Sequence, residues 1–142
     1  MLKLTLLHPE ILMALASNGH GARILIADGN FPISTSLPAK CKIVFLNFSP
    51  GLLTVTDVLK VIRDYIPIEA ATVMIPHDES EQGVHKEFTQ ILGEDIILKS
   101  EKRFDFYREA KSEDTCLAIA TGETRRFANI LIVIGSIKLF EQ

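Results

Sequence analysis

The chain has only two cysteines and no long hydrophobic run. Cys41 and Cys116 each lie inside an apolar segment, and neither belongs to a closely spaced pair of the kind that binds zinc or performs redox chemistry. We therefore expect two buried free thiols and a cytoplasmic protein. Apolar runs such as residues 130–134 are far shorter than the about 20 residues that a membrane-spanning helix needs, so we expect no transmembrane helix.

The sequence also lacks a basic stripe. Its formal net charge is −3, and its lysines and arginines are scattered among acids. Because a phosphate backbone is met by clustered basic side chains, this pattern argues against a nucleic-acid partner. Residues 1–13 are hydrophobic but lack a basic leader and a small-residue cleavage site, so we interpret them as part of the fold. A length of 142 residues, with 47% hydrophobic and 23% charged residues, predicts one globular domain over residues 1–142.

Motifs of several large enzyme classes are missing as well. There is no glycine-rich phosphate loop with a lysine, no GxSxG turn and no dinucleotide-binding fingerprint. Asp28-Gly29-Asn30 is superficially similar to the aspartate loop of haloacid-dehalogenase-like phosphatases, but Asn30 stands where such loops carry a second aspartate. A phosphatase is therefore a poor interpretation.

One cluster of possible metal ligands comprises His77, Asp78, Glu79 and His85. Its two histidines are eight residues apart, and not the three or four that align ligands on one helix face. We interpret the cluster as the solvated acidic start of a helix. We expect neither a metal nor a cofactor.

Hydrophobic periodicity predicts alternating helices and strands. Helices are expected from Pro9 to a stop at Asn18-Gly19, over 54–66 with Thr54 and Asp57 as a capping pair, over 84–92 with Gly93 as a stop, and over 102–111. Strands are expected over 24–27, 41–48, 71–75, 96–99, 116–120 and 129–135, with irregular segments over 29–40 and 121–128. Strands that alternate with helices predict an α/β domain with a largely parallel central sheet flanked by helices.

Two chargeable residues flank the first predicted strand. Asp28 follows it, at the end of a strand where α/β proteins usually bind ligands, and His20 lies in the turn before it. An imidazole exchanges protons near neutral pH, and a carboxylate binds hydroxyls or orients the ring. The two groups emerge at opposite strand ends unless a loop folds back or a neighbouring subunit completes the site. Simpler roles stay open: His20 as a helix-end residue and Asp28 as a turn former.

Arg103 and Asn129 are further candidates for binding polar ligands. RFDFYREA at 103–110 is either an amphipathic helix with aromatic core residues or an arginine fork beside an aromatic wall that covers a sugar. Asn129 is either a residue at the entry of a strand or an amide that binds a polyol.

Four separated segments resemble the L-fucose mutarotase and D-ribose pyranase family, and its fucose mutarotase branch more closely. They are HPEILMALASNGHGARILIADGNFP, ATVMI, RFDFYREA and TGETRRFANILIVIGSI, in the family's order. The resemblance implies interconversion of sugar anomers without a cofactor or metal. It implies that His20 is the acid/base and that Asp28, Arg103 and Asn129 contact the sugar. We expect Phe127, at the position of the family's tyrosine, to pack beside the sugar. It also implies ring-shaped homo-oligomers, often decamers, with sites between subunits.

The chain departs from this family in three places. Phe127 replaces the usual tyrosine before x-Asn, Arg108 and Glu109 exchange the order of two charges, and AKSEDTCLA is about two residues longer than expected. The missing hydroxyl puts the rate and the substrate in question. Three alternatives stay open: a D-ribose pyranase of the same family, a monosaccharide-binding protein without catalysis, which Phe127 favours, and a purely structural oligomer.

Overall fold

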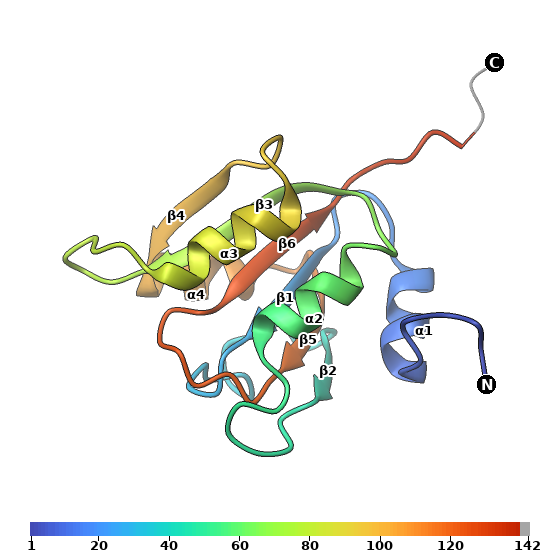
Figure 1. Ribbon diagram of the computed structural model, residues 1–142, viewed down its shortest axis with the longest axis horizontal. Coiled ribbons are helices and arrows are strands. Elements are labelled where there is room, and N and C mark those ends of the chain that lie inside the picture. Colours follow the sequence, from blue (N-terminus) through green and yellow to red (C-terminus); the bar gives the residue numbers. More distant parts are fainter. Residues whose placement is uncertain (140–142) are drawn as a thin grey trace.

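A six-stranded mixed sheet forms the centre of the protein, with strand order β2-β5-β1-β6-β3-β4 (Figure 1). The computed structural model describes residues 1–139. The strands are β1 (Arg23–Ala27), β2 (Lys42–Phe45), β3 (Ile68–Ile75), β4 (Leu98–Lys102), β5 (Thr115–Ala120) and β6 (Ile130–Ile134). Only β6 is antiparallel to its neighbours, β1 and β3, so the predicted α/β fold with a largely parallel sheet is confirmed.

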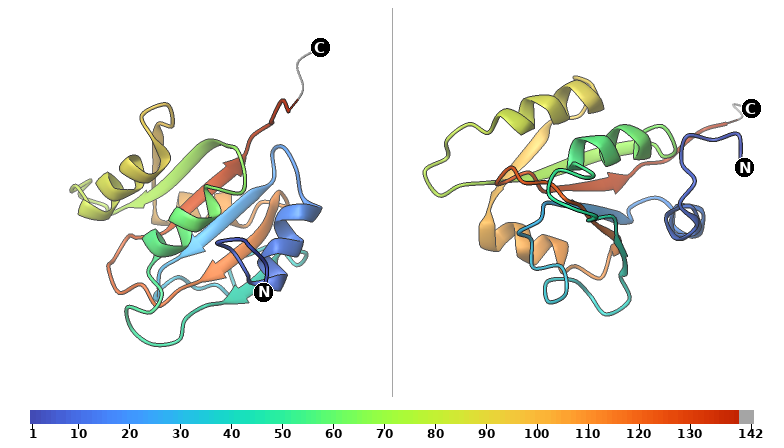
Figure 2. Two further views of the ribbon diagram at one scale, coloured as in Figure 1. Left: turned by 45° about the vertical axis from the view of Figure 1, so that its right-hand side comes forward. Right: turned by 60° about the horizontal axis from the view of Figure 1, so that its bottom comes forward.

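Helices and one long loop cover the two faces of the sheet (Figure 2). Helices α1 (Pro9–Ser17), α2 (Val55–Ile62) and α3 (Gly83–Leu92) pack on one face, and α4 (Arg103–Ala110) packs on the other with part of the irregular segment after β1. Side chains alternate along β1, so Ile24 and Ile26 join the first core while Leu25 and Ala27 join the second. This two-sided burial explains why β1 reads as a continuous apolar run.

The ends of several elements differ from the sequence prediction. The Thr54–Asp57 capping box is present with both hydrogen bonds, but α2 ends at Ile62 and not at residue 66. β2 ends at Phe45, before the expected residue 48. β4 begins at Leu98, which pairs with Ala71 of β3, two residues after the predicted start, and the preceding Ile97 is 86% exposed.

Both cysteines are free and half-buried, and not fully buried as expected. Burial raises the pKa of Cys41 to about 12 and also raises that of Cys116, so both are neutral thiols at pH 7. Within residues 1–139, no helix combines the length and the apolar composition that crossing a bilayer requires.

Candidate functional site

Three polar residues that lie next to the ends of strands β1, β4 and β6 gather at one edge of the sheet. Asp28 directly follows β1, and Arg103 directly follows β4. Asn129 directly precedes β6, which runs opposite to β1 and pairs Ile130 with Ile26 at the end of β1. The reversed direction of β6 therefore brings Asn129 to the edge where β1 ends.

A cavity of about 450 Å³ opens at this edge. Its volume lies in the range typical of small-molecule sites, about 300–1,000 Å³. All four side chains that were expected to contact a sugar line it, and they come from separate parts of the chain: Asp28, Arg103, Phe127 and Asn129. Its wall also includes Asn30, Phe31, Met74, Tyr107 and Arg126.

Asp28 and Asn129 bind each other in both directions. The backbone N–H of Asp28 donates to Asn129 Oδ1 at 2.7 Å, and Asn129 Nδ2 donates to Asp28 Oδ2 at 3.0 Å. The backbone N–H groups of Asn30 and Ala128 also donate to the Asp28 carboxylate. The Asp28 carboxylate thus holds the loop that enters β6 against the end of β1.

Burial raises the pKa of Asp28, which is only 5% exposed, above its ordinary value. Backbone N–H groups, chiefly those of Asn30 and Ala128, oppose this shift. A carboxylate has about four acceptor positions, and three are occupied here. One amide hydrogen of Asn129 has no acceptor among residues 1–139, and Asn129 lines the cavity.

Phe127 is held in an unusual backbone conformation next to this pair. Its φ of 58° lies in the left-handed region, which non-glycine residues rarely adopt. His85 Nε2 lies 2.9 Å from the Phe127 carbonyl oxygen, so the imidazole donates from Nε2. The imidazole ring of His85 stacks on the ring of Phe88, with the two centroids 5.9 Å apart. Burial lowers the pKa of His85, although the hydrogen bond to Phe127 opposes this shift.

The sequence analysis missed this role of His85. It had placed His85 in a solvated acidic cluster, whereas the other members of that cluster lie elsewhere: Asp78 accepts from Ser80, and Glu79 pairs with Lys102. In the part of the chain that the structure describes, no three His, Cys, Asp or Glu side chains are grouped to hold a metal ion. The signal was the spacing of three residues between His85 and the buried Phe88, which puts both on one face of α3.

Helix α4 contributes both to the core and to the cavity wall. The amphipathic helix with aromatic core residues is confirmed, and the contact of Arg103 with a sugar stays a prediction. Phe106 is fully buried and belongs to the core. Tyr107 lines the cavity and meets Phe31 edge-to-face, with ring centroids 5.3 Å apart. Phe104 is exposed.

His20 lies at the opposite edge of the sheet. The next residue, Gly21, donates its N–H to the carbonyl of Ile134 at the far end of β6. The five residues of β1, which span roughly 17 Å, therefore separate His20 from Asp28. His20 is 62% exposed, and its Nε2 lies 3.0 Å from Glu69. The structure brings the four predicted sugar contacts together but does not bring His20 to them within one chain.

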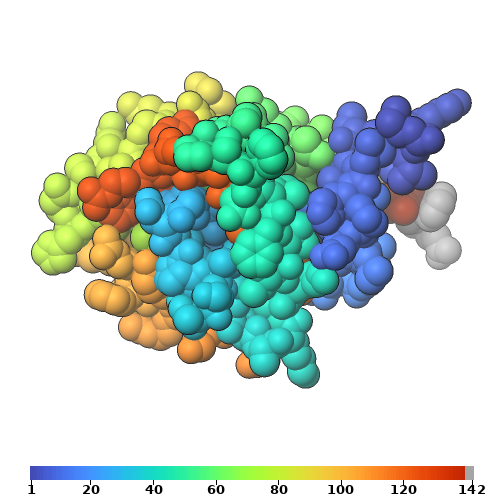
Figure 3. Space-filling view, turned by 90° about the horizontal axis from the view of Figure 1, so that it is seen from below, coloured from blue at the N-terminus to red at the C-terminus, as the bar shows by residue number. Residues whose placement is uncertain are grey.

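A second cavity of about 480 Å³ adjoins the first and was not predicted. Its wall is formed where the segments after β1, β2 and β5 lie side by side (Figure 3). Glu123 is one of its lining residues and is 2% exposed, and its carboxylate accepts from the backbone N–H of Val55 and from the Arg125 guanidinium. Burial raises the pKa of Glu123, but the hydrogen bonds and charge of Arg125 outweigh that effect, and the net shift is downward.

Comparison with known proteins identifies relatives along almost the whole chain. Residues 1–137 match the RbsD / FucU transport protein family. A fucose mutarotase from Danio rerio is 33% identical, over 97% of this chain and 94% of that protein. A D-ribose pyranase from Paracidovorax citrulli is 29% identical, over 95% of this chain and 98% of that protein.

Solved structures share the fold. FucU from Bifidobacterium longum has a TM-score of 0.78 and 28% identity, over 92% of this chain and 95% of that chain. RbsD from Bacillus subtilis, solved in complex with D-ribose, has a TM-score of 0.82 and 23% identity, over 97% of this chain and 100% of that chain. The family match covers nearly every residue, and the chain belongs to the RbsD / FucU family.

Proposed function

We propose that this protein is an isomerase that interconverts the α and β anomers of L-fucose or a related pyranose. The observation that carries the proposal is the single cavity that gathers Asp28, Arg103, Phe127 and Asn129. The relationship to fucose mutarotases, including the one from Danio rerio, supports it. Asp28, Arg103 and Asn129 bind sugar hydroxyls, and the Phe127 ring packs on the sugar.

The reaction needs two proton transfers. A proton is delivered to the ring oxygen as its bond to the anomeric carbon breaks, and a proton leaves the anomeric hydroxyl, whose oxygen becomes the aldehyde carbonyl. Rotation about the adjacent carbon–carbon bond and reversal of these steps close the ring with the opposite configuration. Each transfer by a positioned group contributes about 10²–10⁴-fold to the rate. The oxidation state of the sugar does not change, so no redox cofactor takes part.

His20 is the proton donor and acceptor in this proposal. Because it lies at the opposite edge of its own sheet, the His20 of a neighbouring copy completes each cavity. The hydrogen bond to Glu69 orients its imidazole. A closed ring of subunits supplies every site with such a neighbour. The decameric state and the cytoplasmic location stay predictions.

Two alternatives have specific support. The D-ribose pyranase from Paracidovorax citrulli is also a relative along nearly the whole chain, which favours conversion between ribose pyranose and furanose forms. Phe127 lacks a hydroxyl, which favours a monosaccharide-binding protein that does not catalyse exchange.

Exchange NMR of the anomeric protons separates these functions. L-fucose, D-ribose and D-galactose are each measured with and without the protein. Acceleration for L-fucose supports the proposal, acceleration for ribose alone supports the pyranase, and binding without acceleration supports the binding protein. His20→Ala is expected to fold and to lose most of the acceleration, while His77→Ala, at an exposed position, is the matched control.

A mixing experiment tests whether sites form between subunits. His20→Ala and Arg103→Ala chains are each nearly inactive in this proposal. When the two are unfolded together and refolded, some cavities receive an intact Arg103 from one chain and an intact His20 from its neighbour. Random mixing is expected to restore roughly a quarter of the wild-type rate. No recovery in mixed oligomers of normal mass would contradict a site shared between chains.

A further inference from the structure

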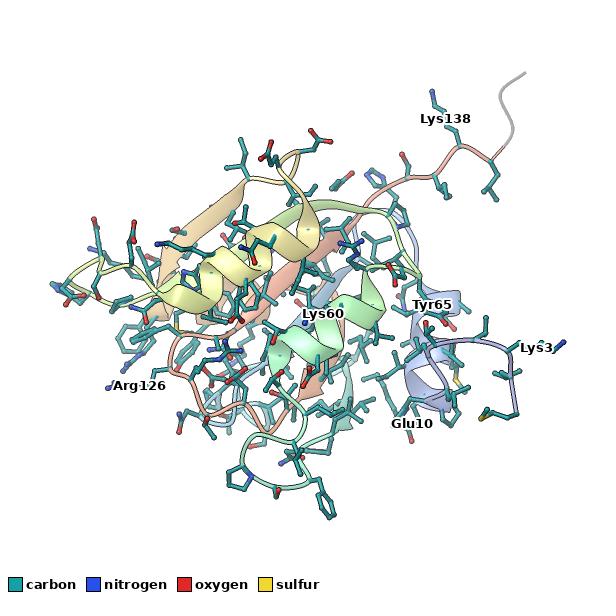
Figure 4. All side chains as sticks on the ribbon, viewed as in Figure 1. Lys3, Glu10, Lys60, Tyr65, Arg126 and Lys138 are labelled. Carbon is teal, nitrogen blue, oxygen red and sulfur yellow. The ribbon has the colours of Figure 1, made fainter. Side chains whose placement is uncertain are left out.

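Phe127 lines the sugar cavity from a backbone conformation that its surroundings must hold. Its φ of 58° lies in the left-handed region, which is strained for a bulky side chain. Such conformations persist where neighbouring groups fix them, and they are frequent at binding sites. Phe127 lies in the connection between β5 and β6, and Figure 4 shows the preceding residue, Arg126, projecting outward from this connection. The contacts that hold the connection therefore decide where the Phe127 ring lies.

The connection is anchored on both sides of Phe127. Before it, the Arg125 guanidinium donates to the Glu87 carboxylate of α3 at 2.7 Å. After it, the backbone N–H of Ala128 donates to the Asp28 carboxylate at 3.3 Å. These contacts fix residues 125 and 128, and the orientation of the peptide groups between them needs a further contact.

His85 supplies that further contact from the first turn of α3. Its Nε2–H donates to the carbonyl oxygen of Phe127 at 2.9 Å. The imidazole is itself held in place, because it stacks on the ring of the fully buried Phe88. A hydrogen bond from a fixed donor sets the plane of the peptide group that follows Phe127. His85 thereby stabilises the left-handed conformation from which the Phe127 ring projects.

We propose that His85 is a positioning residue of the sugar site. It is not part of the cavity wall, and it acts through Phe127, whose carbonyl it holds and whose ring packs on the sugar. This role rests on the proposed anomer exchange. The Phe127 ring contacts the sugar in the ground state and in the transition state alike. Its displacement is therefore expected to weaken sugar binding and to leave the reaction of the bound sugar nearly unchanged.

Two substitutions separate the hydrogen bond of His85 from its stacked ring. His85→Phe keeps an aromatic ring beside Phe88 but removes the donor, and His85→Gln keeps a side-chain N–H donor. Anomer exchange of L-fucose is measured by NMR at a series of sugar concentrations. We expect His85→Phe to raise KM about two- to tenfold, the effect of one lost hydrogen bond, with kcat within about twofold of wild type. His85→Gln is expected to restore most of the wild-type KM.

A contact that serves only the fold gives a different result. In that case His85→Phe lowers the fraction of folded protein, so the apparent kcat falls while KM stays unchanged. Urea unfolding measures the stability of each variant, and light scattering measures its mass. The matched control is Gln90→Phe, which places the same ring at an exposed position of α3 and is expected to keep the wild-type KM.

A double substitution tests whether His85 acts through the Phe127 ring. Phe127→Ala removes the ring and keeps the carbonyl. In the Phe127→Ala chain, His85→Phe is expected to raise KM little further, because the group that His85 positions is already gone. Additive effects of the two substitutions on KM would overturn the proposal.

The wild-type protein provides a test that does not depend on the folding of a variant. The Nε2–H resonance of His85 is expected to shift when L-fucose saturates the cavity, because this hydrogen bond joins His85 to a residue that contacts the sugar. An unchanged resonance would overturn the role of His85, and so would an unchanged KM in His85→Phe or equally raised KM values in His85→Phe and His85→Gln. Each of these results leaves the proposed function intact if the wild type exchanges L-fucose. Absence of exchange for every sugar in the wild type overturns the proposed function and this role together.

Discussion

Asn129 closes a reciprocal pair of hydrogen bonds with Asp28, accepting from its backbone N–H at 2.7 Å and donating to its carboxylate at 3.0 Å. The two residues are 101 positions apart in the chain. Their pairing joins the end of β1 to the start of β6 and fixes which amide atom of Asn129 faces the carboxylate. The amide hydrogen that remains is therefore presented in one direction, which suits recognition of a defined hydroxyl.

Replacing Asn129 with alanine tests this pair. Asn129→Ala leaves the buried N–H of Asp28 without its acceptor and removes a donor to the carboxylate. We expect a loss of about 1–3 kcal/mol in the free energy of unfolding, measured in urea, and a large loss of anomer exchange. Asn47→Ala, at an exposed position near the adjoining cavity, is the control. Unchanged stability in Asn129→Ala would show that the pair contributes little.

Much of the fold could be predicted because the signals are local. The apolar run at 24–27 and the Thr54–Asp57 pair specify a buried strand and a helix start within a few residues. The segment at 129–135 likewise predicts a strand but carries no local sign of its direction. Since the direction of β6 depends on its neighbours, the position of Asn129 beside Asp28 was implied only by the resemblance.

The least predictable contacts join distant residues through the backbone. The partner of His85 is the carbonyl oxygen of Phe127, and every residue has a carbonyl, so the side-chain identities give no hint of the pairing. Glu123 was missed for the same reason, because one of its partners is the N–H of Val55. His20 was correctly identified as emerging at the strand end opposite Asp28, because that follows from strand geometry alone.

Glu123→Gln is expected to destabilise the protein at neutral pH. It removes a buried charged acceptor of Val55 and Arg125, and we expect a loss of about 1–3 kcal/mol in the free energy of unfolding. Because the pKa of Glu123 is lowered in the folded chain, its stabilisation is present above the unfolded value of about 4.3 and is lost as the pH falls through the folded pKa. The difference between wild type and variant should therefore shrink in acid.

The control for this change is Glu87→Gln. Glu87 pairs with the same guanidinium of Arg125 at 2.7 Å but is 48% exposed, so its loss is expected to cost under about 1 kcal/mol. Urea unfolding from pH 7 to well below the unfolded glutamate pKa of about 4.3 measures both variants. Equal losses for Glu87→Gln and Glu123→Gln would show that burial of Glu123 does not matter.

His85 is expected to make the folded protein sensitive to mild acid. Burial lowers its pKa in the folded chain, so the unfolded chain binds the proton more readily. The stability is complete above the unfolded pKa of about 6.5 and is lost as the pH falls below that value, by at most about 1.4 kcal/mol per pH unit. His85→Gln keeps an amide donor for the Phe127 carbonyl and should reduce this loss. His77→Gln is the exposed control, and equal acid sensitivity in wild type and His85→Gln would contradict the role of His85.

Phe127→Tyr is expected to increase the rate of anomer exchange. The resemblance to mutarotases places a tyrosine at this position, and the ring of Phe127 lines the cavity, so a hydroxyl added there faces the substrate. One additional hydrogen bond in the transition state is worth about 0.5–1.5 kcal/mol, or roughly two- to tenfold in kcat/KM. The left-handed backbone of residue 127 accommodates tyrosine as it does phenylalanine, so stability should change by less than about 0.5 kcal/mol.

Two further variants test whether Tyr107 supplies the hydroxyl that Phe127 lacks. Phe104→Tyr adds a hydroxyl on the exposed side of α4, outside the cavity, and is expected to leave the rate unchanged. Tyr107 lines the cavity beside Phe31, and its hydroxyl is the candidate to replace the hydroxyl that residue 127 lacks. If Tyr107 compensates, Tyr107→Phe lowers the rate of the wild-type chain but has little effect once Phe127→Tyr is present. Equal effects of Tyr107→Phe in both backgrounds would mean that the two hydroxyls act independently, and the replacement at residue 127 would then be uncompensated.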